Sequence, residues 1–291
     1  MPAPDNILAR YAAMYRLIHD SALTFLQAWE RTQSPLRVLE IGAEPYVFTA
    51  RLLETFDWDV HCVSVPPYIW PGEMPSPQYV CVDLQIHERK RRVPVTLLNV
   101  ERDSLPYADG YFDAALCMDV VQYLGYHPTR MFYELRRVLR PDGLLLLTMP
   151  NGLSLRRLLW LIGGIVDADP FTARGVYARR QRSIAPQEID ALISGCGFRI
   201  KRFEFLNLAS LPDSPLPRLL AIAAQVITSV ALPPLYRRRD YIVLLATASR
   251  PLQAAYPDGM YHQVRLYPPL TWAAQDESTI RKALVTKRRT L

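Results

Sequence analysis

Apolar and polar positions follow two different rhythms along most of the chain. Short apolar runs bounded by turn residues are typical of buried strands, and between them apolar residues recur at helical spacing. The runs that predict strands are 37–42, 58–65, 95–100, 112–119, 143–149, 199–206 and 241–248. Helical spacing is found at 6–30, 46–56, 128–139 and 186–196. Strands that alternate with helices predict an α/β fold on a mostly parallel sheet with right-handed crossovers.

Three segments break this alternation. Residues 66–94 form a proline-rich connection that holds a short strand-like piece at 79–82 and an exposed basic turn at 87–92. Residues 151–185 lie between a strand and a helix, where an insertion that covers a substrate is expected. Beyond residue 250 no periodicity is found before a basic, helix-like end at 278–289.

The length of 291 residues suits one large α/β domain with appendages. We expect this domain to span residues 1–250. Its appendages are an N-terminal helix at 1–34 and insertions on the substrate side of the sheet at 151–185 and 207–237. Residues 251–291 are expected to form a C-terminal tail.

Composition places the chain among folded proteins of a reducing compartment. Half of the residues are hydrophobic, which is enough for a full core. The cysteines show neither metal-ligand spacing nor a disulfide framework, and the N-terminus lacks the basic start and apolar stretch of a signal peptide. They are Cys62, Cys81, Cys117 and Cys196. The sequence therefore predicts a cytoplasmic protein without a metal site.

Positive charge is concentrated in a few places. The net charge is +6, and arginine and lysine cluster at 89–92, 179–182, 237–239 and 281–289. Mild basicity of this kind suits an anionic substrate or a membrane surface. No zinc-finger spacing and no aromatic-basic motif for RNA is found, so we do not expect nucleic acid as a partner. The oligomeric state is left open.

The first predicted strand leads into a turn and a helix that together suit an anionic ligand. Glu40 is the last polar side chain of the strand, Gly42 follows, and the helix begins near Tyr46. Backbone N–H groups at the start of such a helix attract an anionic group. The segment resembles the first motif of class I S-adenosylmethionine-dependent methyltransferases, an acidic residue followed by three alternate glycines. Glu44 and Tyr46 stand at the second and third glycine positions.

Later blocks carry the same resemblance in the order that the family has. Residues 99–124 hold a Leu-Pro pair and a strand that ends near Met118, and residues 134–151 read Glu-Leu-Arg-Arg-Val-Leu-Arg-Pro-Asp-Gly at their start. Residues 184–198 begin Ile-Ala-Pro-Gln-Glu and end Gly-Phe. Four ordered blocks over 37–206 are more specific than one glycine motif. The chain thus resembles the methyltransferase type 11-like branch of the family.

This resemblance implies a fold and a cofactor. The fold is Rossmann-like and doubly wound, with seven strands that are mostly parallel, an antiparallel pair formed by the last two strands at one edge, and helical insertions. The cofactor is S-adenosylmethionine. The residues expected to bind it are Glu40, Gly42, Ala43, Glu44, Tyr46, Thr49, Ser64, Glu101, Arg102, Met118 and Asp119.

Some of these positions depart from the family. Ser64 stands where the family usually has an acidic residue that accepts both ribose hydroxyls, and a serine hydroxyl makes one such contact without the strength that a charge adds. Glu101 matches the acidic residue that receives the adenine amino group, with Arg102 beside it. Pro45 rigidifies the turn and donates no hydrogen bond there, so we expect the methionine end of the cofactor to be held differently.

Candidates for catalysis follow the strand that ends near residue 119. An oxygen acceptor needs a general base within hydrogen-bond reach. Many relatives have a histidine where this chain has Tyr123, and a tyrosine with its usual pKa of about 10 is a poor base. His127 follows closely, either as a substitute base or as a surface residue, and Asp119 is the third candidate. We therefore keep His127, Tyr123 and Asp119 as the candidates for the catalytic residue.

The sequence favours an S-adenosylmethionine-dependent methyltransferase, and by resemblance an O-methyl transfer to a small-molecule or glycan acceptor. A non-catalytic methyltransferase-like domain that binds a partner is one alternative, because Ser64, Tyr123 and the missing glycines depart from the family. The other is a membrane-surface enzyme with a lipid-linked acceptor, peripheral at the inner membrane face.

Two apolar segments with neighbouring arginines, 156–166 and 219–232, support the membrane alternative. The second is shorter than the roughly 20 residues that span a bilayer, so it would lie in the interface. The plainer interpretation is that these segments pack together over the substrate side of the sheet.

Overall fold

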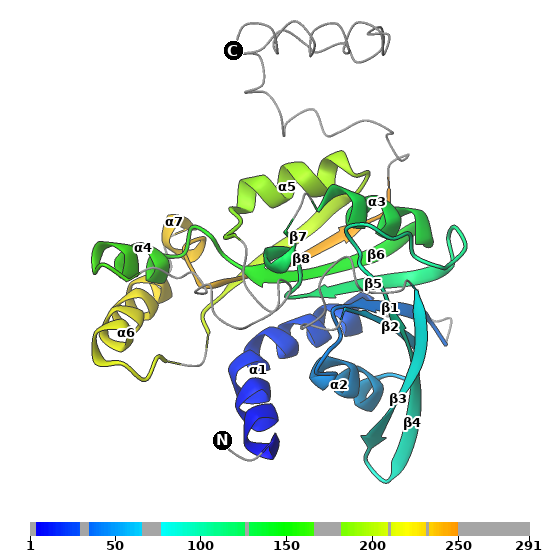
Figure 1. Ribbon diagram of the computed structural model, residues 1–291. Helices are drawn as coiled ribbons and strands as arrows, with labels where there is room; N and C mark the ends of the chain where they lie inside the picture. Colours follow the sequence, from blue (N-terminus) through cyan, green and yellow to red (C-terminus); the bar gives the residue numbers. More distant parts are fainter. Residues whose placement is uncertain are drawn as a thin grey trace, which may run out of the picture.

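The computed structural model describes residues 4–29, 35–65, 77–125, 128–165, 182–208, 211–230 and 233–249. Within this part of the chain, eight strands form a single sheet in the order β3-β4-β2-β1-β5-β6-β8-β7 (Figure 1). The strands are β1 Arg37–Ile41, β2 Asp59–Ser64, β3 Gln78–Ile86, β4 Arg89–Leu97, β5 Phe112–Met118, β6 Leu139–Pro150, β7 Arg199–Leu206 and β8 Tyr241–Thr247.

The middle of the sheet is parallel and its edges are antiparallel. Strands β4, β2, β1, β5 and β6 pair in parallel. Strand β8 runs antiparallel to both β6 and β7, which gives the antiparallel edge that the resemblance implies. The chain therefore has the Rossmann-like, mostly parallel fold that the sequence predicts.

One strand more than expected is present, at the opposite edge. The strand-like piece predicted at 79–82 lies in the first half of β3, which pairs antiparallel with β4. Residues 89–92, expected in an exposed turn, belong to β4, and the turn is confined to His87 and Glu88. The arginines of this segment are tolerated in a strand because they lie on a β-ribbon with most of β3 open to water.

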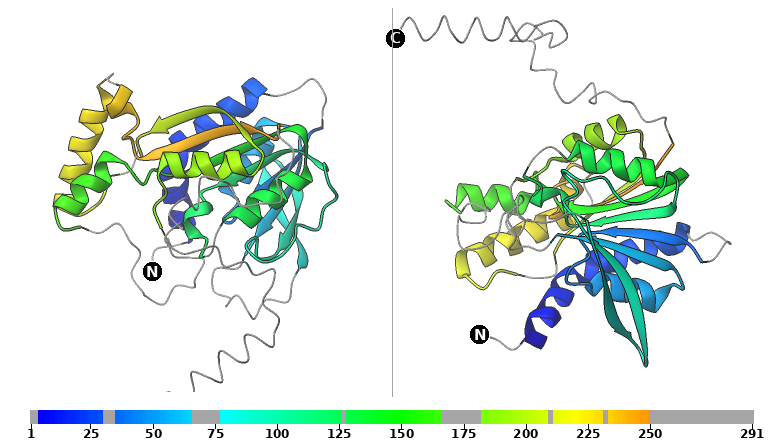
Figure 2. Two further views of the ribbon diagram at one scale, coloured as in Figure 1. Left: turned by 90° about the horizontal axis from the view of Figure 1, so that it is seen from above. Right: turned by 45° about the vertical axis from the view of Figure 1, so that its right-hand side comes forward.

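Helices cover both faces of the sheet, as Figures 1 and 2 show. The helices are α1 Pro4–Trp29, α2 Val47–Thr55, α3 Thr129–Val138, α4 Leu155–Ile162, α5 Pro186–Gly195, α6 Pro215–Ser229 and α7 Pro233–Tyr236, with a 3-10 turn, η1, at Val121–Tyr123. Helices α1 and α2 pack on one face and α3 and α5 on the other, and each side has its own buried core. Apolar spacing thus placed α1, α2, α3 and α5 within two residues of their observed bounds.

Helices α4 and α6 project from one end of the sheet and pack against each other (Figure 1). They fall inside the two segments expected as insertions. No helix in the described ranges is both long enough and apolar enough to cross a membrane. The predicted tail at 251–291, with its basic end, lies outside the described residues.

Candidate cofactor site

A cavity of about 370 Å³ lies where the parallel strands β1, β2, β4 and β5 end. Ligands of open α/β sheets bind in the crevice at the carboxyl ends of the strands, so this is the expected place. Its walls are largely apolar, with a few polar groups between them. The lining residues are Tyr11, Tyr15, Ile41, Gly42, Glu44, Pro45, Val63, Ser64, Val65, Leu98, Asn99, Val100, Met118, Asp119, Val120, Tyr123 and Leu124.

The turn after β1 depends on Gly42. Its φ of +73° lies in the left-handed region, and its N–H donates to the Val63 carbonyl at 2.8 Å. A Cβ at this position would lie 2.3 Å from Cγ2 of Val120, so no side chain fits without movement. The first glycine of the motif is therefore retained for two reasons, its conformation and the close approach of Val120.

At the third glycine position of the motif this chain has Tyr46, which adopts the backbone conformation that glycine would favour. Tyr46 has a left-handed φ of 65° immediately before α2, and its N–H donates to the Ala43 carbonyl at 2.5 Å. Ala43 is buried in the core between α1, α2 and the sheet. The turn thus keeps the left-handed conformation that glycine would favour, although neither Ala43 nor Tyr46 lines the cavity.

Glu40 and Thr49 form a buried pair behind this turn. Glu40 is 1% exposed, and the Thr49 hydroxyl donates to its Oε2 at 2.7 Å. Burial raises the pKa of the Glu40 carboxyl to about 8, while the Thr49 hydrogen bond opposes the rise. Neither Glu40 nor Thr49 is among the residues that line the cavity.

Ser64 places a hydroxyl in the cavity wall at the end of β2. The residue is 4% exposed, and its Oγ has no hydrogen-bond partner at bonding geometry in the described structure. The Tyr46 phenol is near enough that Ser64 opposes the rise which burial causes in the Tyr46 pKa. A buried hydroxyl without a satisfied partner is costly unless a ligand or water completes it.

At the end of β4 the cavity is lined by Asn99 and Val100, not by Glu101. Asn99 is 4% exposed, and its Oδ1 accepts the N–H of Glu101 at 2.9 Å. Glu101 Oε2 accepts the N–H of Gly125 at 3.2 Å, and Arg102 Nε donates to Asp103 at 3.0 Å. Neither Glu101 nor Arg102 is among the lining residues, and the contact of Glu101 with adenine stays a prediction.

Asp119 is held from two directions. It follows β5 with a left-handed φ of 65°, and its N–H donates to the Thr148 carbonyl at 3.1 Å. The Tyr241 hydroxyl donates to its carboxylate at 2.6 and 2.8 Å, and Gln122 Nε2 donates to Oδ1 at 2.7 Å. The carboxylate therefore enters the cavity wall with a fixed orientation.

Tyrosines from α1 and η1 complete the wall around Asp119. Tyr11 and Tyr15 pack with ring centroids 4.6 Å apart, and Tyr15 meets the ring of Tyr241 edge-on at 6.1 Å. Burial raises the pKa of Tyr11 and of Tyr15, and the negative charge of Asp119 raises both further. These phenols therefore stay protonated near neutral pH and can donate hydrogen bonds into the cavity.

The structure brings together only part of the predicted set. Gly42, Glu44, Ser64, Met118 and Asp119 line the cavity, together with the catalytic candidate Tyr123. His127 lies outside the described residues. The sequence interpretation missed Tyr11, Tyr15 and Asn99. Tyr11 and Tyr15 fall in the segment with helical spacing at 6–30, which does form a helix, but this helix also covers the cavity. The signal for Asn99 was its place near the carboxyl end of the predicted strand 95–100.

These residues have the chemistry that S-adenosylmethionine requires. The apolar side chains of Val63, Leu98 and Leu124 suit an adenine ring, and the unpartnered Ser64 hydroxyl suits a ribose hydroxyl. Asp119 supplies negative charge for the cationic end of the molecule. No group of His, Cys, Asp and Glu in the described ranges is arranged to hold a metal ion.

Residues 75–147 match the model of a family described as "Methyltransferase domain". The sheet order and the cavity at the carboxyl ends of the strands are those of a class I, Rossmann-like fold, and the match indicates a methyltransferase domain within it. The match agrees with the resemblance found in the second and third sequence blocks, which it overlaps. The match includes β4, β5 and α3, and therefore Asn99 and Asp119.

Three solved structures of low identity are similar to this chain. A putative methyltransferase in complex with the Haloferax volcanii Trm112 methyltransferase activator is 11% identical, with 81% of this chain and 92% of that chain covered and a TM-score of 0.49. A possible histamine N-methyltransferase from Thermotoga maritima is 18% identical, with 84% and 96% covered and a TM-score of 0.46. A putative sarcosine dimethylglycine methyltransferase from Galdieria sulphuraria is 16% identical, with 79% and 84% covered and a TM-score of 0.44. No curated protein matches the sequence.

Proposed function

We propose that the chain binds S-adenosylmethionine in the cavity at the carboxyl ends of β1, β2, β4 and β5 and transfers its methyl group to an acceptor. The observation that carries this proposal is the Ser64 hydroxyl, which is buried in the cavity wall with no partner at bonding geometry. The family match over residues 75–147 supports the same conclusion.

Each lining group has a role in this proposal. Ser64 binds one ribose hydroxyl, Asn99 binds the polar edge of adenine, and Val63 and Leu98 pack on the ring. Asp119 holds the cationic part of the cofactor, with Tyr241 and Gln122 fixing its carboxylate. When bound, the cofactor supplies a methyl group on a positively charged sulfur, so the protein mainly has to position the two reactants.

We further propose a hydroxyl group of a small molecule or a glycan as the acceptor. The support is the likeness of the four sequence blocks to enzymes that methylate sugars, lipids and natural products. In this proposal Asp119 orients the cofactor rather than taking the proton of the acceptor, because its carboxylate already accepts hydrogen bonds from Tyr241 and Gln122. Tyr123 lies on the same wall and would orient the acceptor.

Isothermal titration with S-adenosylmethionine and with its demethylated product tests the proposal. We expect one site per chain, and weaker binding in Ser64→Ala than in the wild type. No heat of binding at millimolar ligand would contradict the proposal and favour a non-catalytic binding domain. Binding of the product without methyl transfer to any of a panel of sugars, lipids and natural products would contradict only the catalytic part.

A further inference from the structure

Helices α4 and α6 each expose several large apolar side chains to solvent. Leu161, Ile162, Leu219 and Val226 have exposed fractions of 65%, 75%, 63% and 65%. We call the whole set the outer face. It consists of Leu158, Leu161 and Ile162 on α4 and Leu216, Leu219, Ile222, Val226 and Ile227 on α6, with Val230 directly after it. Single exposed apolar residues need no explanation, but a cluster on one side of two helices marks an interaction surface.

The outer face is exposed although the two helices pack well on each other. Their inner sides meet where Trp160 Nε1 donates to the Pro217 carbonyl at 3.1 Å. A Cβ on Gly163 would lie 3.1 Å from Leu220, so the helices approach closely there. Ala221 and Ala224 are buried. The plainer interpretation of the sequence, that these segments pack together, therefore accounts for their inner sides only.

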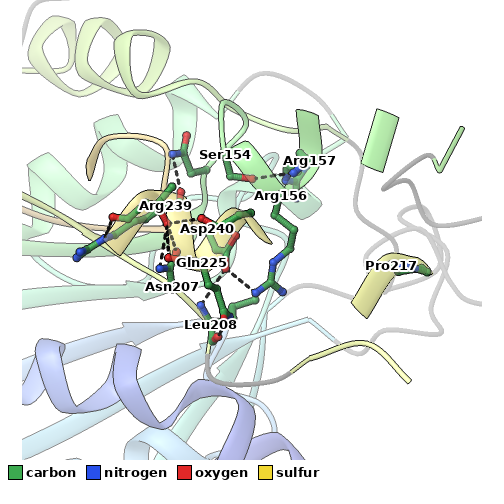
Figure 3. Close-up of polar contacts among 12 residues, drawn as sticks. Ser154, Arg156, Arg157, Asn207, Leu208, Pro217, Gln225, Arg239 and Asp240 are labelled. Atoms are coloured by element: carbon green, nitrogen blue, oxygen red, sulfur yellow. Dashed lines mark hydrogen bonds and ion pairs between the residues drawn. The ribbon is translucent and has the colours of Figure 1, made fainter. Parts of the chain in front are cut away.

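A buried polar network fixes the two helices on the end of the sheet (Figure 3). Arg156 and Asp240 form an ion pair at 2.7 Å with side chains 7% and 6% exposed. Asp240 also accepts the N–H of Leu208 at 3.1 Å, and Gln225 Nε2 donates to the Leu208 carbonyl at 2.8 Å. Arg239 Nε donates to the Thr228 carbonyl at 3.2 Å. The outer face is thus held in one orientation relative to the sheet.

Charge distinguishes between the partners that could cover this face. Neither α4 nor α6 contains an acidic residue, whereas Arg157 and Arg218 lie on the helices and Arg237 and Arg238 follow α7. A second copy of the chain would bring the same positive charges together across a two-fold interface. An anionic lipid surface would attract these charges and accept the apolar side chains.

Helix α4 of the outer face and the candidate cofactor site follow the carboxyl ends of two neighbouring strands. Strand β6 ends at Pro150 and leads into α4, and its neighbour β5 ends at Met118, which lines the cavity. Both features are therefore at the carboxyl edge of the sheet. Helix α6 has 15 residues, a length of about 22 Å, so it can lie on a bilayer but not span one.

We propose that the outer face inserts into the interfacial region of a membrane that contains anionic phospholipid. The cavity is then presented to an acceptor anchored in that membrane. The proposed membrane contact is argued only from the outer face and the arginines near it. The proposed class of acceptor rests on the proposed function.

Flotation of the full chain with vesicles of phosphatidylcholine and phosphatidylglycerol tests the membrane contact. We expect the wild type to float, Val226→Glu to lose at least tenfold in partitioning, and Arg218→Gln to lose about fivefold on anionic vesicles only. Val80→Glu is the matched control, because Val80 is also exposed, at 41%, but lies on the β3 edge. It should float like the wild type.

The inference would be overturned if the wild type stayed in the bottom fraction of the gradient. It would also be overturned if Val226→Glu floated like the wild type. A wild-type dimer that Val226→Glu converts to a monomer would also overturn it, since a second copy would then cover the face. Titration with S-adenosylmethionine separates the two proposals. Flotation of a chain that binds no cofactor would leave the membrane contact standing and contradict the proposed function.

Discussion

The Tyr241 hydroxyl donates to both carboxylate oxygens of Asp119, at 2.6 and 2.8 Å. Tyr241 begins β8 and Asp119 follows β5, and these two strands lie on opposite sides of β6. The contact therefore ties the antiparallel edge of the sheet to the cavity wall. It gives β8, which contributes no residue to the cavity lining, a direct part in positioning a group of the candidate site.

Replacing Tyr241 by phenylalanine should lower both stability and cofactor affinity. The variant removes a hydrogen bond to a charged group, which typically contributes about 1.5–3 kcal/mol. Urea unfolding and titration with S-adenosylmethionine measure the two effects. Tyr236→Phe is the control, because its hydroxyl accepts the Phe205 N–H at 3.2 Å away from the cavity. It should lose stability only, and equal losses of cofactor affinity in both variants would contradict the role of Tyr241.

Gly42→Ala should destabilise the fold by about 2–4 kcal/mol, because the new Cβ combines a left-handed φ with a clash against Val120. Gly164→Ala separates these causes. Gly164 has a similar φ of +72°, but nothing lies within 4 Å of its Cβ position, so it should cost only about 1 kcal/mol. The double variant Gly42→Ala, Val120→Ala should be less destabilised than Gly42→Ala alone. Equal losses for the two glycine variants in urea unfolding would show that the clash is relieved at little cost.

Ser64→Ala should weaken S-adenosylmethionine binding about five- to tenfold, the effect of one hydrogen bond of about 1 kcal/mol or slightly more. It should change the stability of the free protein little, because the Ser64 Oγ has no partner at bonding geometry, although the Tyr46 phenol lies near it. Calorimetric titration and thermal unfolding of the same samples measure both. Destabilisation without loss of affinity would mean that the hydroxyl serves the fold rather than a ligand.

Glu40 should make the fold less stable as pH rises. Burial raises its pKa in the folded state to about 8, above the unfolded value of about 4.3, so the folded state holds a proton that the unfolded state has released between these values. Stability from this group is complete below about pH 4 and is lost up to about pH 8. Glu40→Gln should remove that loss and be more stable at pH 8 by a few kcal/mol.

Urea unfolding of wild type and Glu40→Gln between pH 5 and 9 measures this difference. Comparing the two proteins isolates Glu40, because His19 is present in both. Burial lowers the pKa of His19 to about 4, so its own contribution rises with pH in the acidic range. Parallel stability curves for the two proteins would contradict the buried, protonated state of Glu40.

Periodicity predicted the sheet well because buried strands and helix faces leave a local signal in the sequence. It failed at 89–92, where four consecutive basic residues suggested a turn. This part of β4 is exposed to solvent, so it lacks the alternation of apolar and polar residues that marks a half-buried strand. The candidate site was predicted in part. Gly42 directly follows a strand and Ser64 ends one, so both could be located, whereas Asn99 was not among the predicted residues.

The remaining parts of the site depend on contacts between distant segments. Tyr241 lies 122 positions after Asp119, and Tyr15 comes from the first helix. Neither position has a local pattern that indicates a cavity. The departure at Tyr46 was predicted as a variant turn, and its left-handed φ shows how the chain manages without the third glycine.

A crystal structure of the chain with S-adenosylhomocysteine tests the central claim most directly. We predict density for the adenosine between Ser64 and Asn99, with a ribose hydroxyl within hydrogen-bond distance of the Ser64 Oγ and the amino acid end directed toward Gly42 and Asp119. An empty cavity at saturating ligand, or a ligand bound elsewhere on the molecule, would contradict the account.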